Sequence, residues 1–443
     1  MDKNLLNLVK EAGIVGAGGA GFPTYAKLNS KADYVIINGA ECEPLLRVDQ
    51  QLMRDNSQEI LVALKLVMEQ VGASHGVIAV KEKYHEAVDS LEKTINKYDD
   101  ISIFKLENFY PAGDEQILVY EVTGRIVPEG GIPLNVGAIV CNVETMLNIY
   151  EAYYNEVPVT DTYVTVTGAV NNRKTMKLPI GMSIREAIDL AGGTYLDEFL
   201  VVNGGPMMGK VVDIDSFITK TTKGLIVLPK EHKLCKDLQK DVQTMLKESK
   251  TACMHCIHCS EVCPRNLIGH DLHPHKMMRI ASYNSLCDNK TTPINAYLCC
   301  ECRLCEYACI MDLQPWKLHN LLKNTMKKNG IKNTCHNQPQ KVNPFRELRR
   351  YPISKLIRKL GLMEYDKSAP IEYGKISTKK VSILLNQHIG APSKVIVNVG
   401  DAVKKGDLIA KIPDNSLGSN IHASIDGTIE DVQENVVIIN GEK

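Results

Sequence analysis

Two copies of one cysteine pattern constrain what this chain of 443 residues can fold into. Each copy has the spacing C-x2-C-x2-C-x3-C. Together they hold eight of the fourteen cysteines: Cys253, Cys256, Cys259, Cys263, Cys299, Cys302, Cys305 and Cys309. This is the spacing with which small ferredoxins hold two [4Fe–4S] clusters. The surrounding segment must therefore bring these thiolates onto two clusters, and the chain is expected to move electrons one at a time.

The pattern also predicts which cysteines share a cluster, because in two-cluster ferredoxins the fourth cysteine of each run ligates the other cluster. We expect one cluster to be bound by Cys253, Cys256, Cys259 and Cys309. We expect the second to be bound by Cys299, Cys302, Cys305 and Cys263. Structural zinc is the alternative, but zinc sites usually use two separated pairs of ligands and not two repeated quartets.

The remaining cysteines have no ligand spacing. Cys300 lies inside the second run but out of register, and we expect it to be a neighbour of the cluster and not a ligand. The other five are expected to be ordinary packed or surface thiols: Cys42, Cys141, Cys235, Cys287 and Cys335. A histidine string follows the first run, and Pro274 inside it favours a solvated loop over a metal or corrinoid site: His270, His273 and His275.

Length and charge exclude several classes of protein. A chain of this length is expected to hold about two to four domains. Lysine plus arginine and aspartate plus glutamate both number 52, so no net charge favours binding to nucleic acid. No uncharged apolar stretch approaches the ~20 residues that a membrane span needs, and the N-terminus lacks the pattern of a secretory signal. Metal-binding cysteines, in place of a disulfide framework, favour a cytoplasmic location.

The periodicity of apolar residues predicts a multidomain α/β and α+β architecture. Residues 1–155 alternate strand-like and helix-like runs, which predicts an α/β domain with a largely parallel sheet. Residues 156–217 predict a small β-grasp-like unit, and residues 246–322 contain the cysteine runs. The segments 218–245 and 323–379 are charged and are expected to be connectors.

The two ends of the chain carry smaller features. Residues 1–12 predict a short amphipathic helix that packs on the first domain, with a docking or targeting tag as the alternative. Residues 380–443 predict the strands and turns of the flattened barrel of biotinyl and lipoyl modules. The hairpin tip at 413–420 has no lysine, so we expect a structural or docking role and not a lipoylated carrier arm.

A glycine-rich loop is one candidate ligand-binding segment of the first domain. Gly16, Gly18 and Gly21 match the pattern G-x-G-x-x-G. A predicted helix and not a strand precedes them, which argues against a Rossmann fingerprint. Backbone amides in such a loop can still bind phosphate, and Lys27 lies one helical step further on. The loop is therefore a candidate anion site.

An acidic loop is the second candidate segment. It follows the predicted strand at 34–39, so its polar side chains lie at the carboxyl end of a strand, where α/β sheets place ligands. Asn38 can bind a flavin or nicotinamide ring, and Glu41 and Glu43 can bind ribose hydroxyls or ring nitrogens. A solvated surface turn is the alternative, but the nearby glycine loop favours a ligand site.

These segments resemble those of a known family. VGAGGAGFPTYAKL and NGAECEP are similar to the FMN and NADH segments of the flavoprotein subunit of respiratory complex I. They resemble the RnfC-like family still more closely. The resemblance continues through YPAGDEQILVYEVTGR, GGIPLNVG and CNVETMLNIYEA, an SLBB-type β-grasp unit, the dicluster segment and a terminal barrel-sandwich module. That module comes last here, as in the PduS-type cobalamin reductases, a branch of the RnfC-like family.

The resemblance implies roles for residues of the first domain. Four residues would hold the phosphate and ribityl chain of FMN: Gly16, Gly18, Gly19 and Lys27. Asn38 and Glu41 would contact the flavin, and Phe22 and Glu43 would hold NADH. Five later residues would complete the flavin pocket: Gly113, Asp114, Glu115, Asn142 and Thr145. Ala17 and Ala40 replace the Arg and Asp of the complex I pattern, a departure that concerns the pyridine nucleotide most.

The resemblance also implies a function. The expected protein is an NADH-dependent oxidoreductase in which FMN and two [4Fe–4S] clusters pass electrons to cobalamin, in support of a B12-dependent diol dehydratase. The implied partners are NADH and a corrinoid or corrinoid-handling protein, with an adenosyltransferase or the shell of a bacterial microcompartment as further ones. One alternative is an electron-transfer subunit of an Rnf-type or amino-acid reductase complex. Another is an adaptor that works through its SLBB and barrel modules.

Overall fold

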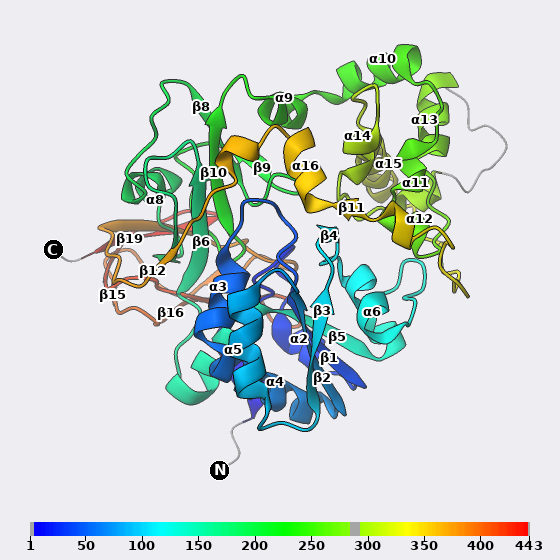
Figure 1. Ribbon diagram of the computed structural model, residues 1–443. Helices are drawn as coiled ribbons and strands as arrows, with labels where there is room; N and C mark the ends of the chain where they lie inside the picture. The colour runs from blue at the N-terminus through cyan, green and yellow to red at the C-terminus, as the bar shows by residue number, and fades with distance from the viewer. Residues whose placement is uncertain (1–3, 284–292, 442–443) are drawn as a thin grey trace.

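The computed structural model describes residues 4–283 and 293–441 (Figure 1). Its first part is a layered α/β domain with four parallel strands, as the alternating sequence pattern predicts. In sheet order these strands are β3 (Ile101–Leu106), β2 (His75–Lys81), β1 (Tyr34–Gly39) and β5 (Ala138–Asn142). The register pairs Tyr34 with both His75 and Ala138, so the carboxyl ends of β1, β2 and β5 meet at one edge.

Both faces of this sheet are covered by helices. Because side chains alternate along a strand, Val35 and Ile37 of β1 face one core and Ile36 faces the other. Helices on the first face are α3 (Val48–Asp55), α4 (Ser57–Val71), α5 (His85–Ile95) and α7 (Val143–Tyr150). The opposite face is covered by α6 (Glu115–Thr123). Because both faces of the sheet are apolar and covered, the polar groups that could bind a ligand lie at the ends of the strands.

The predicted N-terminal helix is α1 (Leu5–Glu11). Asn4 caps it by accepting a hydrogen bond from the Asn7 amide at 3.2 Å. Leu5 and Val9 are buried in the core of the first domain, so the helix packs there as predicted. The glycine loop lies between α1 and α2 (Thr24–Leu28), which confirms that a helix precedes it.

The β-grasp-like unit is a six-stranded mixed sheet with α8 (Ile184–Leu190) packed against it. Its strands, in sheet order, are β12 (Ile371–Glu372), β7 (Lys174–Pro179), β6 (Asp161–Gly168), β10 (Gly224–Pro229), β8 (Phe199–Asn203) and β9 (Lys210–Val212). The interpretation of residues 218–245 as a connector is wrong for β10. This strand runs parallel to β6 and antiparallel to β8 at the centre of the sheet. A short apolar run between charged segments gave no sign of those distant pairing partners.

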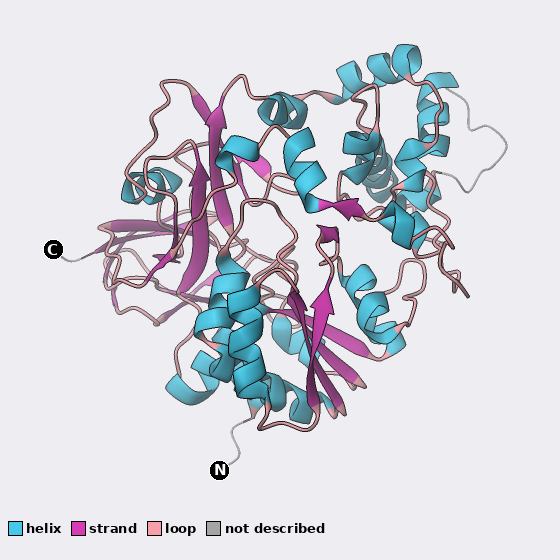
Figure 2. Ribbon diagram, viewed as in Figure 1, coloured by secondary structure: helices cyan, strands magenta, loops and turns pink. Residues whose placement is uncertain are grey.

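The cysteine segment consists of helices and loops in its described parts (Figure 2). The helix α9 (Lys233–Gln239) precedes this segment. The α-helices of the segment are α10 (Val242–Ala252), α11 (His258–Glu261), α12 (Pro264–Leu267), α13 (Pro274–Tyr283), α14 (Leu304–Ala308) and α15 (Pro315–Lys328). A 3-10 turn, η3, covers Ile294–Leu298. Met245, Met277 and Leu318 form a small core between α10, α13 and α15. Cys287 lies outside the described residues.

The C-terminal module contains two small sheets. One has the order β13 (Lys380–Leu384), β19 (Val436–Gly441), β18 (Gly427–Val432) and β15 (Ala402–Val403). The other has the order β14 (Lys394–Val395), β16 (Leu408–Lys411) and β17 (Ile421–His422). Figure 1 shows the module beside the β-grasp sheet, where the Ser382 amide donates to the Gly181 carbonyl at 2.8 Å. Its apolar residues join the core of the first domain, so the module is part of the main body.

The segment 323–379 forms strand pairs with two other parts of the chain. Its β11 (Tyr351–Pro352) pairs with β4 (Phe109–Tyr110) of the first domain, and its β12 extends the β-grasp sheet. Between them lies α16 (Ile353–Lys359), and short 3-10 turns cover Glu347–Arg349 and Met363–Tyr365. In the first domain, Pro133–Val136 forms a 3-10 turn and Glu151–Asn155 a π-helical turn. Within the described residues, no helix combines the length and apolar character needed to cross a membrane.

Candidate functional site

The glycine loop presents backbone amides at the carboxyl edge of the parallel sheet. A bridge between Val15 and Pro23 closes its base, and the Gly16 amide donates to the Phe22 carbonyl at 2.9 Å. The Ala17 amide donates to Thr145 Oγ1 at 3.0 Å, which ties the loop to the first turn of α7. The next three residues, 18–20, are exposed, and their amides have no acceptor among the described residues. A run of such amides can bind a phosphate.

Polar side chains lie at two strand ends beside glycines, Asn142 next to this loop and Asn38 next to Gly113. Asn38, near the end of β1, donates through Nδ2 to the Gly113 carbonyl at 2.8 Å. Asn142, at the end of β5, caps α7 by accepting from the Glu144 amide. A Cβ on Gly18 would lie 3.2 Å from Asn142 Nδ2, and one on Gly113 would lie 3.2 Å from Asn38 Oδ1. The glycines therefore allow loop and strand ends to approach each other closely.

Glu41 faces the start of a helix. Its Oε1 accepts from the Asp49 amide at 2.9 Å, and its Oε2 accepts from Gln50 Nε2 at 2.7 Å. It thereby satisfies amides in the first turn of α3. Asp49 is itself buried, which raises its pKa to about 7, and its Oδ2 accepts from Asn142 Nδ2 at 2.8 Å. The acidic loop, α3 and β5 are thus joined through carboxylates.

Glu43 faces the β-grasp unit. Its carboxylate accepts from the amides of Met207 and Met208 at 2.8 and 2.9 Å. A Cβ on Gly205 would lie 2.1 Å from Glu43 Oε2, so only glycine allows this approach. Burial raises the pKa of Glu43 to about 7, although the two amides and Arg303 favour the charged form.

This pKa predicts that the free energy of unfolding falls as the pH rises from about 4.5 to about 7. The folded protein holds a proton on Glu43 in that window and the unfolded chain, with a pKa of 4.5, does not. The upper limit of the loss is about 3 kcal/mol, since one pKa unit corresponds to about 1.4 kcal/mol. Urea denaturation at about pH 5.5 and 7.5 should show a smaller loss in Glu43→Gln than in the wild type. Glu115→Gln, at an exposed carboxylate, is the control, and equal losses in all three proteins would contradict the prediction.

Other predicted site residues have partners of their own. Lys27 Nζ donates to the Val140 carbonyl at 2.7 Å and pairs with Glu115 at 3.3 Å. Asp114 caps α6 through Oδ1, and its Oδ2 accepts from Arg265 Nη2 at 2.8 Å. Phe22, at the end of the glycine loop, is 38% exposed. Asp114 therefore connects the flavin-type segments to the cysteine segment.

Two cavities lie in the cysteine segment. The inner cavity, of about 290 Å³ including its open mouth, is lined by Cys263, Cys299, Cys302 and Cys305, with Cys300 in its wall. The outer cavity, of about 400 Å³ measured likewise, is lined by Cys253, Cys256, Cys259 and Cys309. No three His, Cys, Asp or Glu side chains of the described residues converge closely enough for one metal ion. The thiols instead surround spaces larger than one ion.

The two cysteine loops share an unusual backbone conformation. His255 and Glu301 precede the second cysteine of each run, with φ values of 54° and 58°. Ile257 and Arg303 follow it, both with φ of 63°. Residues other than glycine rarely adopt this left-handed region. Its repetition at matching positions shows that the two loops curl alike around their cavities, as expected for two equivalent sites.

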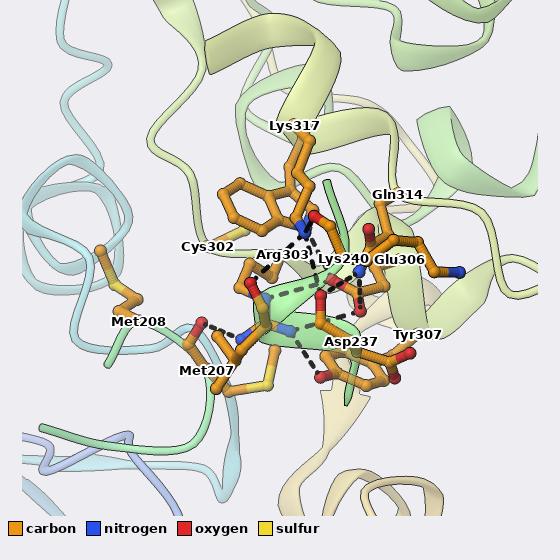
Figure 3. A network of polar contacts seen from close by, with 12 residues as sticks. Met207, Met208, Asp237, Lys240, Cys302, Arg303, Glu306, Tyr307, Gln314 and Lys317 are labelled. Carbon is orange, nitrogen blue, oxygen red and sulfur yellow. Dashed lines mark hydrogen bonds and ion pairs between the residues drawn. The ribbon is translucent and has the colours of Figure 1, made fainter. Parts of the chain in front are cut away.

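A buried polar network joins the inner cavity to the β-grasp unit (Figure 3). Arg303, which is 2% exposed, donates to Glu306 at 3.1 Å and to the hydroxyl of Tyr307 at 3.0 Å. Its Nη1 donates to the carbonyls of Pro206 and Met207 at 3.2 and 3.3 Å. The loop 204–209 is therefore held on one side by Glu43 and on the other by Arg303.

The histidine string is not a solvated loop. His270 is 3% exposed, and its Nε2 lies 2.9 Å from the Val127 carbonyl of the first domain. His275 Nδ1 lies 2.7 Å from Ser260 Oγ, and His273 Nε2 lies 3.0 Å from Asp271. The prediction of a solvated loop was wrong for His270, which a segment distant in sequence covers, whereas His273 and His275 are half-buried and have partners within the cysteine segment. Each histidine has its own partner.

Comparison with families of known proteins assigns four parts of the chain. Residues 9–151 match the Nuo51 FMN-binding domain, and residues 163–211 match the SLBB domain. Residues 252–314 match the 4Fe-4S dicluster domain, and residues 362–443 match the RnfC barrel sandwich hybrid domain. The predicted fold class and the terminal position of the sandwich module are confirmed.

Similar proteins cover almost the whole chain. Cobalamin reductase PduS of Salmonella typhimurium strain LT2 is 40% identical over 97% of this chain and 95% of its own length. PduS of Citrobacter freundii is 40% identical over 98% and 96%. This chain belongs to the PduS family. One subunit of the Na⁺-translocating ferredoxin:NAD⁺ oxidoreductase complex of Acetobacterium woodii is 37% identical over 59% of this chain and 57% of its own length.

In this member of the PduS family, the C-terminal module also reaches the glycine loop. Lys220 is 2% exposed, and its Nζ donates to the carbonyls of Gly13 and Asn420 at 2.7 and 2.6 Å. The Ile389 amide donates to the Gly21 carbonyl at 3.2 Å. These contacts were missed from the sequence because their partners are far apart along the chain. The predicted tip at 413–420 is thus partly buried against the first domain.

Proposed function

We propose that this protein is an NADH-dependent flavo-iron–sulfur reductase that passes electrons through FMN and two [4Fe–4S] clusters to cobalamin. The observation that carries the proposal is the contact between the inner cavity and the flavin-type segments. Arg265 in the cavity wall pairs with Asp114 at 2.8 Å, and the hydroxyl of Tyr110 donates to the Cys302 carbonyl at 3.0 Å. A flavin-type site and a thiol-lined site therefore adjoin within one chain. The acceptor is taken from the name of the PduS relatives.

FMN is proposed to bind at the carboxyl edge of the parallel sheet. The amides of Gly18 and Gly19, beside Gly16, suit its phosphate. Residues around the strand ends would surround the rest of the molecule: Asn38, Glu41, Gly113, Asp114, Glu115, Asn142 and Thr145. Lys27 would act on this site through its charge and its bond to the end of β5. Bound FMN accepts two electrons together and can release them singly, which is the chemistry that a nicotinamide donor and one-electron clusters require.

Gly19 provides a direct test of the flavin site. Its φ is +80° and a Cβ there would meet no atom within 4 Å, so the neighbouring space is open to a ligand. Gly72, at the C-cap of α4, has a φ of +69° and equally open space. Alanine at either position should cost about 1–2 kcal/mol of stability, because both glycines are left-handed. Only Gly19→Ala should weaken FMN binding, by at least about tenfold in a fluorescence titration, which corresponds to about 1.4 kcal/mol. Equal FMN affinity in the two variants would contradict this placement.

The clusters are proposed to follow the grouping of thiols in the two cavities. Cys299, Cys302, Cys305 and Cys263 would ligate one cluster in the inner cavity. Cys253, Cys256, Cys259 and Cys309 would ligate the other in the outer cavity. Four thiolates around a space larger than one ion suit a [4Fe–4S] cube, and the matching backbone of the two loops supports equivalent sites.

The surroundings of the cavities support an order of electron transfer. The inner cavity borders the flavin-type segments, whereas the outer cavity has exposed walls in Cys256, Met254 and Ile310. Electrons would enter at the inner site and leave at the outer one. One NADH yields NAD⁺, a proton and two electrons, which reduce two cob(III)alamin molecules to cob(II)alamin or one molecule by two successive steps.

Phe22 and Glu43 are proposed to serve NADH. The exposed ring of Phe22 offers an apolar surface at the end of the glycine loop. Glu43 is bonded to the loop 204–209, so it would act on the nucleotide by fixing this loop beside the site or by exchanging one amide for the ligand. The domain boundaries predicted from the sequence are also part of the proposed function.

The relatives also suggest a setting. We propose that the protein works in the cytoplasm, within or beside a bacterial microcompartment, and delivers electrons to a corrinoid or a corrinoid-handling protein such as an adenosyltransferase. Co-purification with shell proteins or with an adenosyltransferase from the native host would test this setting independently of the redox chemistry.

The reductase proposal is tested with anaerobically purified protein that contains flavin, iron and sulfide. NADH should reduce cob(III)alamin, and the reaction should be followed by the corrinoid spectrum. Cys302→Ala should retain NADH oxidation with an artificial acceptor that takes electrons from flavin but lose cobalamin reduction. Flavin-loaded protein that does not oxidise NADH would overturn the proposal.

A second function is favoured by the similarity to a component of the Acetobacterium woodii complex. In that case the chain would exchange electrons with another protein carrier, as part of an Rnf-type or amino-acid reductase complex. The same preparation distinguishes the two functions. Faster reduction of ferredoxin than of cobalamin would favour the role within such a complex.

A further inference from the structure

Arg265 has two unused donors beside the inner cavity. It lies on α12, two residues after Cys263, and is 8% exposed. Its Nη2 donates to Asp114 Oδ2 at 2.8 Å. Its Nε and Nη1 are buried and have no oxygen or nitrogen acceptor among the described residues, and the thiol of Cys300 interacts with the guanidinium. The two open donors lie on either side of the Nη2 group that binds Asp114, so they point in different directions.

Such unused groups require a partner. A buried polar group without a hydrogen bond costs about 1–3 kcal/mol, and a charged group costs more. Arg265 lines the inner cavity together with Cys263, Cys299 and Cys302, so the surrounding chemistry is that of sulfur. The neighbouring Arg303 also lines this cavity, but its donors are used by Glu306, Tyr307 and backbone carbonyls. Of the two arginines that line this cavity, Arg265 is therefore the one with donors that no oxygen accepts, and sulfur is the acceptor around them.

The paired nitrogen of Arg265, Nη2, leads to the flavin-type segments. Asp114 follows Gly113, whose carbonyl accepts from Asn38 Nδ2 and whose amide donates to the Cys42 sulfur at 2.8 Å. Asp114 Oδ1 also accepts from two amides in the first turn of α6. Its position is therefore fixed independently of Arg265, and it orients the guanidinium toward the cavity.

We propose that Arg265 is a positioning residue that donates Nε–H or Nη1–H to a sulfur atom of the cluster in the inner cavity, and so raises its reduction potential. The inference rests on the proposed function, because it assumes a cluster there. Reduction adds negative charge to a cluster, and a cation with N–H groups directed at sulfur stabilises the reduced state more than the oxidised one. No lysine or arginine of the described residues lines the outer cavity, so the effect belongs to the inner cluster alone.

The test is a redox titration followed by electron paramagnetic resonance. The double variant Arg265→Met/Asp114→Asn removes the cation without leaving a buried carboxylate unpaired, and asparagine can still cap α6. At the wild-type midpoint, the ratio of reduced to oxidised inner cluster should fall at least about tenfold, which is 59 mV for a one-electron couple. The inner cluster is identified as the one lost in Cys302→Ala. The outer cluster should keep its potential.

Three controls make the result decisive. Asp114→Asn alone removes a negative charge and should not lower the potential. Arg346→Met/Glu121→Gln removes another buried ion pair, whose residues line neither cavity, and should leave both potentials unchanged. Arg265→Lys retains the positive charge, and it replaces the double variant in this test if that variant does not fold. The decrease in the potential of the inner cluster should then be smaller. Unchanged potentials in a double variant that holds both clusters would overturn the inference. Wild-type protein without clusters would instead overturn the proposed function.

Discussion

Cys263→Ala is expected to remove the [4Fe–4S] signal of the inner cavity and to leave that of the outer cavity. The three other proposed ligands in the inner cavity belong to the opposite run, Cys299, Cys302 and Cys305. Losing one of four thiolate ligands should therefore damage the cluster of the second run, although the substitution lies in the first. Iron should fall from about eight toward about four per chain. Iron analysis and electron paramagnetic resonance of the reduced protein measure both effects.

Matched variants distinguish two ligand arrangements: crossed ligation, in which each cluster takes its fourth cysteine from the other run, and ligation of each cluster by a single run. Cys302→Ala should remove the same signal as Cys263→Ala, and Cys256→Ala should remove the other. Cys235→Ala replaces a fully buried thiol outside both cavities and should leave both signals intact. If Cys263→Ala and Cys256→Ala instead removed the same signal, each run would bind its own cluster and the proposed crossing would be wrong.

Arg303→Met is expected to lower the free energy of unfolding by about 3–5 kcal/mol, the cost typical of breaking a buried ion pair from one side. The substitution leaves the buried carboxylate of Glu306 without its cation, although Gln314 and Trp316 still donate to it at 3.0 and 2.6 Å. It also removes the donors to Pro206 and Met207, so the loop 204–209 loses one of its two supports. Anaerobic urea denaturation followed by circular dichroism measures the loss.

Two comparisons test the cause of this loss. Arg185 pairs with Asp215 at the surface, where its side chain is 53% exposed, and Arg185→Met should cost no more than about 1 kcal/mol. Arg303→Met/Glu306→Gln removes both buried charges and should recover part of the stability lost in the single variant. Similar losses for Arg303→Met and Arg185→Met would show that the buried network contributes little.

The glycine loop illustrates what the sequence could predict. Its helix-preceded glycines argued for a phosphate loop outside the Rossmann pattern, and the structure places it between α1 and α2 with three exposed residues. Glycine spacing and helical periodicity are local properties, so they can be read without knowing the fold. Two distant partners could not be predicted in this way: Ile389, which donates to Gly21 in the loop, and Lys220, which donates to Gly13 just before it.

Errors in the prediction have the same origin. The strand β10 was predicted to be part of a connector. Its six residues form a strand through pairing with β6 and β8, and the local sequence does not show these partners. His270 was expected in solvent because the carbonyl of Val127 that covers it lies 143 residues away in the sequence. Charged flanking residues and a nearby proline describe the local chain but not what packs against it.

Local sequence patterns were enough to predict the two cysteine loops, the glycine loop and the order of the modules, because ligand spacing and apolar periodicity act over a few residues. How these sites are joined follows from long-range packing. Arg265 meets Asp114 across 151 residues, Glu43 meets Met207 across 164, and Lys220 meets Gly13 across 207. Such contacts arise when whole domains bury their apolar surfaces against one another, and that packing places a thiol-lined cavity beside the flavin-type segments.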